Sequence, residues 1–98
     1  MKLRRWALEL KKRKVAQSRA DINIGKRGIH PGVVEEVRRR LEQEGAVKIR
    51  VLRNARGKVG VEEIRRLAEA VNAFIADWRG YTFVLISKRR PPRHAAKH

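Results

Sequence analysis

Apolar residues recur every three to four positions in three segments of the chain, and this spacing predicts three amphipathic helices. The helices are expected over residues 2–16, 31–44 and 61–73. Pro31 suits the first turn of the second helix, because a backbone N–H at that position would have no acceptor within the helix. Gly45 follows that helix as a stop signal. Each helix therefore has one apolar face that must pack against another layer.

Between and after these helices, shorter segments either alternate apolar with polar residues or form brief apolar runs. Alternation is typical of half-buried strands, and short runs of β-branched and aromatic residues are typical of buried ones. The predicted strands are residues 22–24, 46–53, 74–78 and 81–87, with a turn at Arg79-Gly80. The order of elements is thus one helix followed by β-α-β-α-β-β.

This order predicts a small single domain of the α/β class that covers residues 1–87. Strands separated by helices need crossover connections, whereas the last two strands can form a hairpin. The sheet is therefore expected to be mixed, with helices packed against it. Residues 88–98 are rich in basic residues and proline, and we expect them to form a disordered basic tail.

The turn after the first strand has the sequence Gly25-Lys26-Arg27-Gly28 and leads into the helix that begins at Pro31. Glycine lets the backbone turn sharply and lets a ligand approach closely, because it has no Cβ. Such a turn can present successive backbone N–H groups to an anion, and the N-terminus of the next helix adds partial positive charge. These features indicate a phosphate-binding loop, with a plain strand-to-helix turn as the alternative.

The balance of charges indicates a polyanionic partner. The chain has 26 Lys and Arg against 10 Asp and Glu, a formal net charge of +16 at pH 7. Most of the excess lies in residues 1–28 and 79–98, while the middle of the chain is nearly balanced. Nucleic acid is the leading candidate partner, and an anionic membrane surface is the lesser one. We expect the N-terminal helix, the Gly loop and the tail to converge on one binding surface.

Five basic residues in the middle of the chain have two explanations each. Lys48 and Arg50 alternate with apolar residues in the second strand, where they form either a solvated face or a phosphate contact. Arg53, Arg56 and Lys58 lie in a loop with few acidic residues nearby. For all five, a role in binding and a purely solvated position remain open.

Other side chains that could bind a ligand also have structural explanations. The arginines at 38–40 have glutamates within helical i,i+4 reach, so ion pairing along the helix is the better explanation. Trp6 falls on the apolar stripe of the first helix and is expected to pack in the core. Trp78 and Tyr81 flank the predicted turn, where stacking on bases and simple exposure are equally open.

What the chain lacks disfavours several classes of function. It has no cysteine, which excludes disulfides, thiolate metal sites and cysteine nucleophiles. No apolar run approaches the roughly 18 residues of a membrane span. Asp21, Asp77 and His30 are the catalytic candidates outside helix ion pairs, and they form no recognisable nucleophile–base pair or carboxylate dyad. We therefore expect no catalysis, no metal and no cofactor.

Four sequence features occur in the order and spacing of a known family. They are Ile24-Gly25-Lys26-Arg27-Gly28-Ile29, the helix at 33–41, the strand Val47-Lys48-Ile49-Arg50-Val51 and the closing Gly80-Tyr81-Thr82-Phe83-Val84-Leu85. Over about residues 7–88, the chain thereby resembles the CRM domain, the YhbY-like family of RNA-binding proteins. The resemblance implies a fold like the C-terminal domain of bacterial translation initiation factor three. His30 stands where family members often have Thr or Ser, and we expect it to be a poorer helix cap.

The resemblance also implies RNA binding through the Gly-x-x-Gly loop and its neighbouring basic residues. Stand-alone bacterial members associate with precursors of the large ribosomal subunit, and plant multidomain relatives assist group II intron splicing. We therefore expect a monomeric, cytoplasmic, non-catalytic protein that binds ribosomal RNA in large-subunit assembly, with a small architectural protein that binds duplex DNA as the alternative. The expected RNA-binding residues are Gly25, Lys26, Arg27, Gly28, Lys48, Arg50, Arg53, Arg56, Lys88, Arg89 and Arg90.

Overall fold

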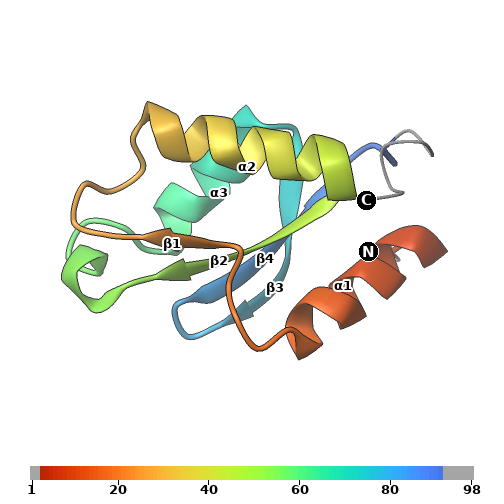
Figure 1. Ribbon diagram of the computed structural model, residues 1–98, viewed down its shortest axis with the longest axis horizontal. Coiled ribbons are helices and arrows are strands. Elements are labelled where there is room, and N and C mark those ends of the chain that lie inside the picture. Colours follow the sequence, from red (N-terminus) through yellow and green to blue (C-terminus); the bar gives the residue numbers. More distant parts are fainter. Residues whose placement is uncertain (1–2, 92–98) are drawn as a thin grey trace.

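The computed structural model describes residues 3–91, and its elements follow the predicted order (Figure 1). The elements are α1 (Arg5–Ala16), β1 (Ile22–Ile24), α2 (Pro31–Glu44), β2 (Ala46–Val51), the 3-10 turn η1 (Arg53–Ala55), α3 (Val61–Ala70), β3 (Ala73–Arg79) and β4 (Thr82–Ser87). The strands form a sheet in the order β1-β2-β4-β3. β1 and β2 are parallel, and the other neighbours are antiparallel. The predicted α/β class and mixed sheet are confirmed.

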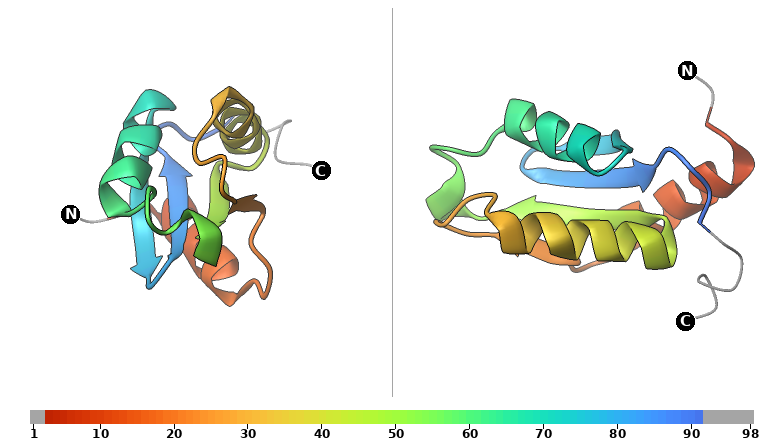
Figure 2. Two further views of the ribbon diagram at one scale, coloured as in Figure 1. Left: turned by 90° about the vertical axis from the view of Figure 1, so that its left-hand side faces the viewer. Right: turned by 90° about the horizontal axis from the view of Figure 1, so that it is seen from above.

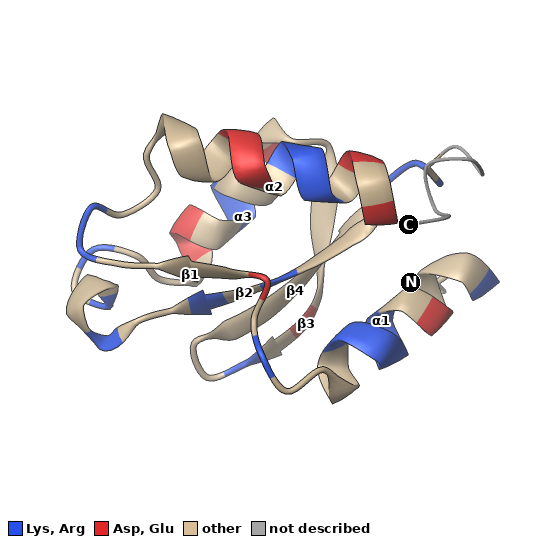
Figure 3. Ribbon diagram, viewed as in Figure 1, with Lys and Arg blue, Asp and Glu red and all other residues tan. Residues whose placement is uncertain are grey.

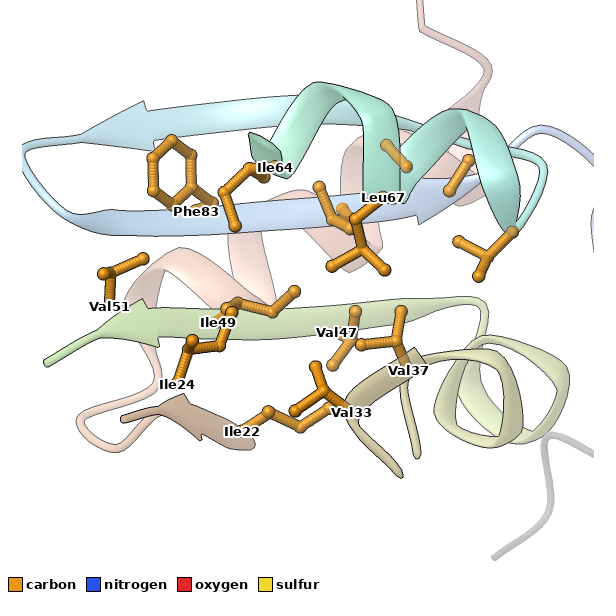
Figure 4. Packing of buried hydrophobic residues seen from close by; sticks show 14 of the residues in the cluster. Ile22, Ile24, Val33, Val37, Val47, Ile49, Val51, Ile64, Leu67 and Phe83 are labelled. Atoms are coloured by element: carbon orange, nitrogen blue, oxygen red, sulfur yellow. The ribbon is translucent and has the colours of Figure 1, made fainter. Parts of the chain in front are cut away.

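The sheet lies between two unequal layers of helix. α2 and α3 cover one face, and α1 lies across part of the other face (Figures 1 and 2). Under α2 and α3, buried residues of β1 and β2 such as Ile22, Ile24 and Ile49 pack with Val37 and Leu67 of the helices (Figure 4). This packing forms the main core. A smaller core beneath α1 contains Ala7, Ala46, Val84 and Ile86.

β4 is buried on both faces because it contributes to both cores. Phe83 and Leu85 pack in the main core, whereas Val84 and Ile86 pack beneath α1. None of these four side chains is more than 1% exposed. A strand that is covered on both faces has a continuous apolar sequence instead of an alternating one. This accounts for the unbroken apolar run that predicted the strand.

Some element boundaries differ from the prediction because local backbone geometry overrides the hydrophobic period. β2 ends at Val51, two residues earlier than predicted, because η1 follows. α3 ends at Ala70, three residues early, and Asn72 then takes a left-handed φ of 58° before β3 begins. α1 begins at Arg5, three residues late, while β3 gains one residue at each end and β4 loses one at its start.

The described chain continues past Ser87, the predicted end of the domain. The N–H of Lys88 donates to the carbonyl of Asn72 at 3.0 Å. Farther along, a Cβ on Gly45 would come within 3.0 Å of Pro91, so Pro91 lies against the C-terminal end of α2. Residues 92–98 of the predicted tail lie outside the described residues.

Lys14 of α1 is buried, which the sequence pattern did not predict. It is 4% exposed, and its Nζ lies 2.8 Å from Asp21 Oδ2 and 2.9 Å from Glu44 Oε1. Asp21 also accepts a hydrogen bond from the Lys48 N–H at 2.8 Å. A buried charge needs partners of this kind, because an unpaired charge is costly away from water. The cluster fastens the C-terminal end of α1 to β2 and to the end of α2.

Replacing Lys14 with methionine should destabilise the domain, because Asp21 and Glu44 then lose their shared cation. We expect the free energy of unfolding to fall by about 3 kcal/mol, the low end for breaking a buried ion pair, since Glu44 is partly exposed. Lys12→Met on the exposed side of α1 is the control and should change it by less than about 0.5 kcal/mol. Urea unfolding measures both variants, and equal midpoints would show that the cluster does not hold α1.

Asp21 should also make the stability depend on pH. Burial raises the pKa of this carboxyl, but hydrogen bonds from Lys14, the Lys48 N–H and Gln17 outweigh burial and lower the pKa below its ordinary value of 3.8. A carboxyl with a lowered folded-state pKa stabilises the fold above its ordinary pKa, and this contribution is lost as the pH falls through the folded-state value. From about pH 5 to about pH 3, the natural protein should therefore lose more stability than Asp21→Asn. Equal losses in urea unfolding at the two pH values would contradict this.

Candidate nucleic-acid interface

The Gly-x-x-Gly segment forms a tight turn at one end of the sheet. The N–H of Gly28 donates to the carbonyl of Gly25 at 2.8 Å, and Gly28 has φ 71°, in the left-handed region that favours glycine. Lys26 and Arg27 occupy the tip of the turn with exposed side chains. Within residues 3–91, neither of their backbone N–H groups donates a hydrogen bond to the protein. The turn therefore offers two N–H groups and two cations, a combination suited to an anion.

A second loop, residues 52–60, packs against this turn. Nζ of Lys58 donates to the carbonyl of Lys26 at 2.9 Å. A Cβ on Gly28 would lie 3.4 Å from Cδ of Lys58, so the two loops are in contact there. Figure 1 shows them side by side beyond the ends of β1 and β2. The second loop supports the Gly turn from one side and adds cations of its own.

We call the surface formed by the two loops the basic end. Its cations are Lys26, Arg27, Arg53, Arg56 and Lys58. Neither the Gly turn nor the second loop contains an acidic residue, and Figure 3 shows the blue segments that gather there. The structure thereby brings the predicted residues Arg53 and Arg56 next to the Gly turn, although they are distant from it in the sequence. It adds Lys58, which the sequence left open.

Arg56 is held between the backbone and an aromatic ring. Its Nε donates to the carbonyl of Val51 at 3.3 Å, and its guanidinium carbon lies 4.2 Å from the centroid of the Tyr81 ring. A guanidinium at this distance from an aromatic face gains a cation–π attraction. Its two terminal nitrogens have no hydrogen-bond partner among the described residues, so they can still donate to a phosphate.

Lys48 and Arg50 have different surroundings although both belong to β2. Nζ of Lys48 donates to the carbonyls of Val15 and Gln17 at the C-terminal end of α1. Basic side chains stabilise helix ends by satisfying the last carbonyls in this way. Lys48 therefore holds α1 in place, a role that neither sequence interpretation included. Arg50 is exposed and lies two residues closer to the basic end.

The remaining predicted residues, Lys88, Arg89 and Arg90, lie far from the Gly turn. They follow β4 near the C-terminal end of α2, at the opposite end of a molecule whose long axis measures 37 Å (Figure 1). β4 runs antiparallel to β2, so its C-terminal end points away from the loop that follows β2. The expectation that the tail and the Gly loop converge on one surface is therefore wrong for residues 88–90.

The arginines of α2 are paired along their own helix. Arg39 lies 2.5 Å from Glu36 Oε1, Arg40 lies 3.3 Å from Glu36 Oε2, and Arg38 lies 3.7 Å from Glu35 Oε2. This confirms the predicted ion pairing. The outer face of α2 therefore carries compensated charge and does not extend the basic end.

His30 is the N-cap residue of α2, and its side chain makes a capping hydrogen bond. Its Nδ1 accepts the N–H of Gly32 at 3.1 Å. A Cβ at position 32 would come within 2.8 Å of the imidazole, so glycine makes room for the ring to fold back. The His-Pro-Gly sequence was the available signal for this cap. The imidazole thus occupies one N–H of the helix end, whereas the N–H groups of Lys26 and Arg27 donate to no other described residue.

The other two residues considered for catalysis are also engaged in structural contacts. Asp21 is paired with Lys14, and Asp77 lies 3.4 Å from Arg79. Within residues 3–91, no cluster of His, Asp and Glu side chains has the composition of a metal site. No helix in that range is long and apolar enough to cross a membrane. Trp6 packs in the smaller core, as predicted.

Comparison with known proteins identifies a family for this chain and a solved structure with a similar fold. A family model described as the CRS1 / YhbY (CRM) domain matches residues 3–86. The solution structure of a hypothetical protein from Staphylococcus aureus, described as a candidate RNA-binding protein, superposes with a TM-score of 0.60. The two chains are 18% identical, and the match covers 96% of each. No curated protein has a sequence that matches this chain.

Proposed function

The chain belongs to the CRS1 / YhbY (CRM) domain family, and from this membership we propose that it binds RNA and grips the sugar–phosphate backbone with its basic end. The description of the Staphylococcus aureus neighbour as a candidate RNA-binding protein supports the same class of ligand. Binding of this kind makes and breaks no covalent bond. The proposal is therefore for a non-catalytic protein.

The contact between the two loops carries the proposal. The hydrogen bond from Lys58 to the carbonyl of Lys26 holds the Gly turn against residues 52–60, so that the two cations of the turn lie beside the three cations of the second loop. A Cβ on Gly25 would meet no atom within 4 Å, so the space above the turn is open to a ligand. Phosphate oxygens accept hydrogen bonds from backbone N–H groups and from Lys and Arg side chains. A strand that crosses the turn meets both kinds of donor.

We extend the proposal to ribosomal RNA in precursors of the large subunit, because that is what the family resemblance implies for a stand-alone domain. Contacts to the phosphate backbone carry no sequence information. The choice of RNA therefore depends on its shape or on bases bound elsewhere on the protein. We propose further that the protein acts as a monomer in the cytoplasm.

A small architectural protein that binds duplex DNA is the alternative, because the same cations would attract any polyanion. Competition at matched salt separates the two. A labelled fragment of ribosomal RNA is displaced with unlabelled RNA or with unlabelled duplex DNA of equal length. We expect the RNA to compete better, and equal competition by duplex DNA would overturn the proposal.

Charge reversal at the tip of the turn should weaken RNA binding strongly. The double variant Lys26→Glu, Arg27→Glu should lose at least about tenfold in affinity at about 0.15 M salt, because two attractive contacts become repulsive. The control Arg89→Glu, Arg90→Glu changes the net charge equally at the opposite end and should lose less than about threefold. Fluorescence anisotropy with a labelled RNA measures both. Equal losses would mean that diffuse attraction, and not the basic end, explains binding.

The salt dependence provides a second readout of the same variants. Each phosphate contact to a single strand contributes about −0.7 to the slope of log affinity against log salt concentration, so the loss of two contacts should flatten the slope by about 1.4. Gly25→Asp offers an independent variant, because φ is not positive there and the added side chain meets open space. It should weaken binding without strain, whereas a side chain at Gly28 would have to adopt a left-handed φ.

A further inference from the structure

The turn of the hairpin between β3 and β4 lies at the same end of the molecule as the basic end (Figure 2). Two large aromatic side chains of this hairpin are exposed. Trp78 is 54% exposed and Tyr81 is 41% exposed. Together with Gly60, Val61, Gly80 and Phe83 they line a cleft between the hairpin and the start of α3. Large exposed aromatic side chains beside such a cleft are typical of a surface that binds a partner.

Trp78 is a pre-organised platform with one covered side. Its ring stacks on Phe83, with 6.0 Å between centroids and 18° between planes. Its Nε1–H donates to the carbonyl of Gly80 at 2.9 Å, which fixes the rotation of the indole. Phe83 is only 1% exposed, so half of the indole surface faces outward while the inner surface rests on the core. A flat ligand that stacks on this ring therefore does not have to immobilise the indole first, which lowers the entropic cost of binding.

The cleft is continuous with the basic end. The carbonyl of Tyr81 accepts the N–H of Val51 at 2.8 Å, which joins the hairpin to the end of β2. The guanidinium of Arg56 lies against the Tyr81 ring and belongs to the same loop as Lys58. Both glutamates that begin α3 are engaged with neighbouring donors: Glu62 pairs with Arg65, and Glu63 accepts the N–H of Gly60 at 2.7 Å and lies 4.0 Å from Arg66. Among the described residues, neither carboxylate at the start of α3 is therefore without a partner beside the cleft.

We propose that the cleft binds an unpaired nucleobase of the same RNA strand whose phosphates lie on the basic end, stacked on the outer face of Trp78. This inference rests on the proposed RNA-binding function and adds the kind of RNA to it. Aromatic side chains beside a cationic groove suit single-stranded nucleic acid, because every base has a π-face that can stack. An apolar peptide would gain from Trp78 but not from the five cations beside it. The cations favour the nucleic acid.

The proposal specifies the ligand as single-stranded or bulged RNA. A base inside a continuous duplex is already stacked on both sides and cannot reach a platform on the protein. Stacking also tolerates all four bases, so the site should favour unpaired nucleotides without reading a sequence. Selection among RNAs would then follow the position of unpaired nucleotides next to an accessible backbone.

The two tryptophans of the chain allow the site to be observed directly. In a Trp6→Phe background, Trp78 is the remaining tryptophan, so its fluorescence reports on the cleft. The probes are a single-stranded RNA oligonucleotide, the same oligonucleotide with abasic nucleotides, and a blunt RNA duplex of equal length. We expect the normal strand to quench Trp78 and the other two to leave it nearly unchanged. The abasic strand should bind about 5- to 150-fold more weakly, the range for loss of one base stack.

Variants at Trp78 test the same site by affinity. Trp78→Ala should reduce the affinity for the normal strand by the same factor of about 5- to 150-fold. The variant should then bind the normal and the abasic strand with equal affinity. Trp78→Phe keeps an aromatic face and should retain most of that advantage. Leu8→Ala is the matched control, because Leu8 is an exposed apolar residue on α1 and should change neither affinity. Circular dichroism shows whether each variant is folded. If Trp78→Ala does not fold, the comparison of normal and abasic strands with the natural protein still tests the site.

Each remaining outcome has a distinct meaning. If normal and abasic strands bind equally and Trp78 is not quenched, while Lys26→Glu, Arg27→Glu still weakens binding, the base-binding cleft is overturned and the proposed function stands. If no RNA binds at about 0.15 M salt, the proposed function itself fails. If Trp78→Ala changes self-association but not RNA affinity, the cleft is a protein contact and the assignment of a base is overturned.

Discussion

Parallel pairing of β1 with β2 is the constraint on which the basic end depends. Ile22 and Ile24 of β1 pair with Ile49 and Val51 of β2, and all four side chains are buried in the main core. In a parallel pair, the carboxyl ends of both strands lie at the same edge of the sheet. The Gly turn and the 52–60 loop must therefore emerge side by side. Each buried side chain contributes about 2 kcal/mol, whereas two exposed cations repel by about 1 kcal/mol or less, so burial can hold the cations together.

The antiparallel arrangement of β4 extends the same end of the molecule. Because β4 runs opposite to β2, its first residues lie beside the last residues of β2, and the β3–β4 turn reaches the loops. This is why Tyr81 meets both the N–H of Val51 and the guanidinium of Arg56. The same direction carries Lys88 and Arg89 to the far end. One choice of strand direction thus brings the aromatic hairpin to the basic end and places residues 88–90 away from it.

The high net charge of the chain is divided among cations with different tasks. Lys14 is buried between two carboxylates, and Lys48 satisfies carbonyls at the end of α1. The arginines at 38–40 are paired along α2. At the basic end, by contrast, the two loops contain no acidic residue. The surface available to a polyanion is therefore set by the positions of the carboxylates as much as by the number of cations.

Local sequence features determined the element order, the α/β class and the position of the glycine-rich basic turn between β1 and α2. Within residues 3–91, the periodic and apolar segments predicted each α-helix and each strand but not the 3-10 turn η1, and the unbroken run in β4 marked a buried strand. The errors in element boundaries come from local backbone geometry, as at Asn72, whose left-handed φ separates α3 from β3.

Only the tertiary structure decided which basic residues act together. It placed Lys58 against Lys26, buried Lys14, turned Lys48 toward α1 and carried Arg89 to the opposite end. The amino-acid sequence by itself determined which faces are apolar and which loop carries glycines and cations, because those properties belong to neighbouring residues. Contacts between distant side chains depend on strand order and direction, and these exist only once the elements have packed into one sheet.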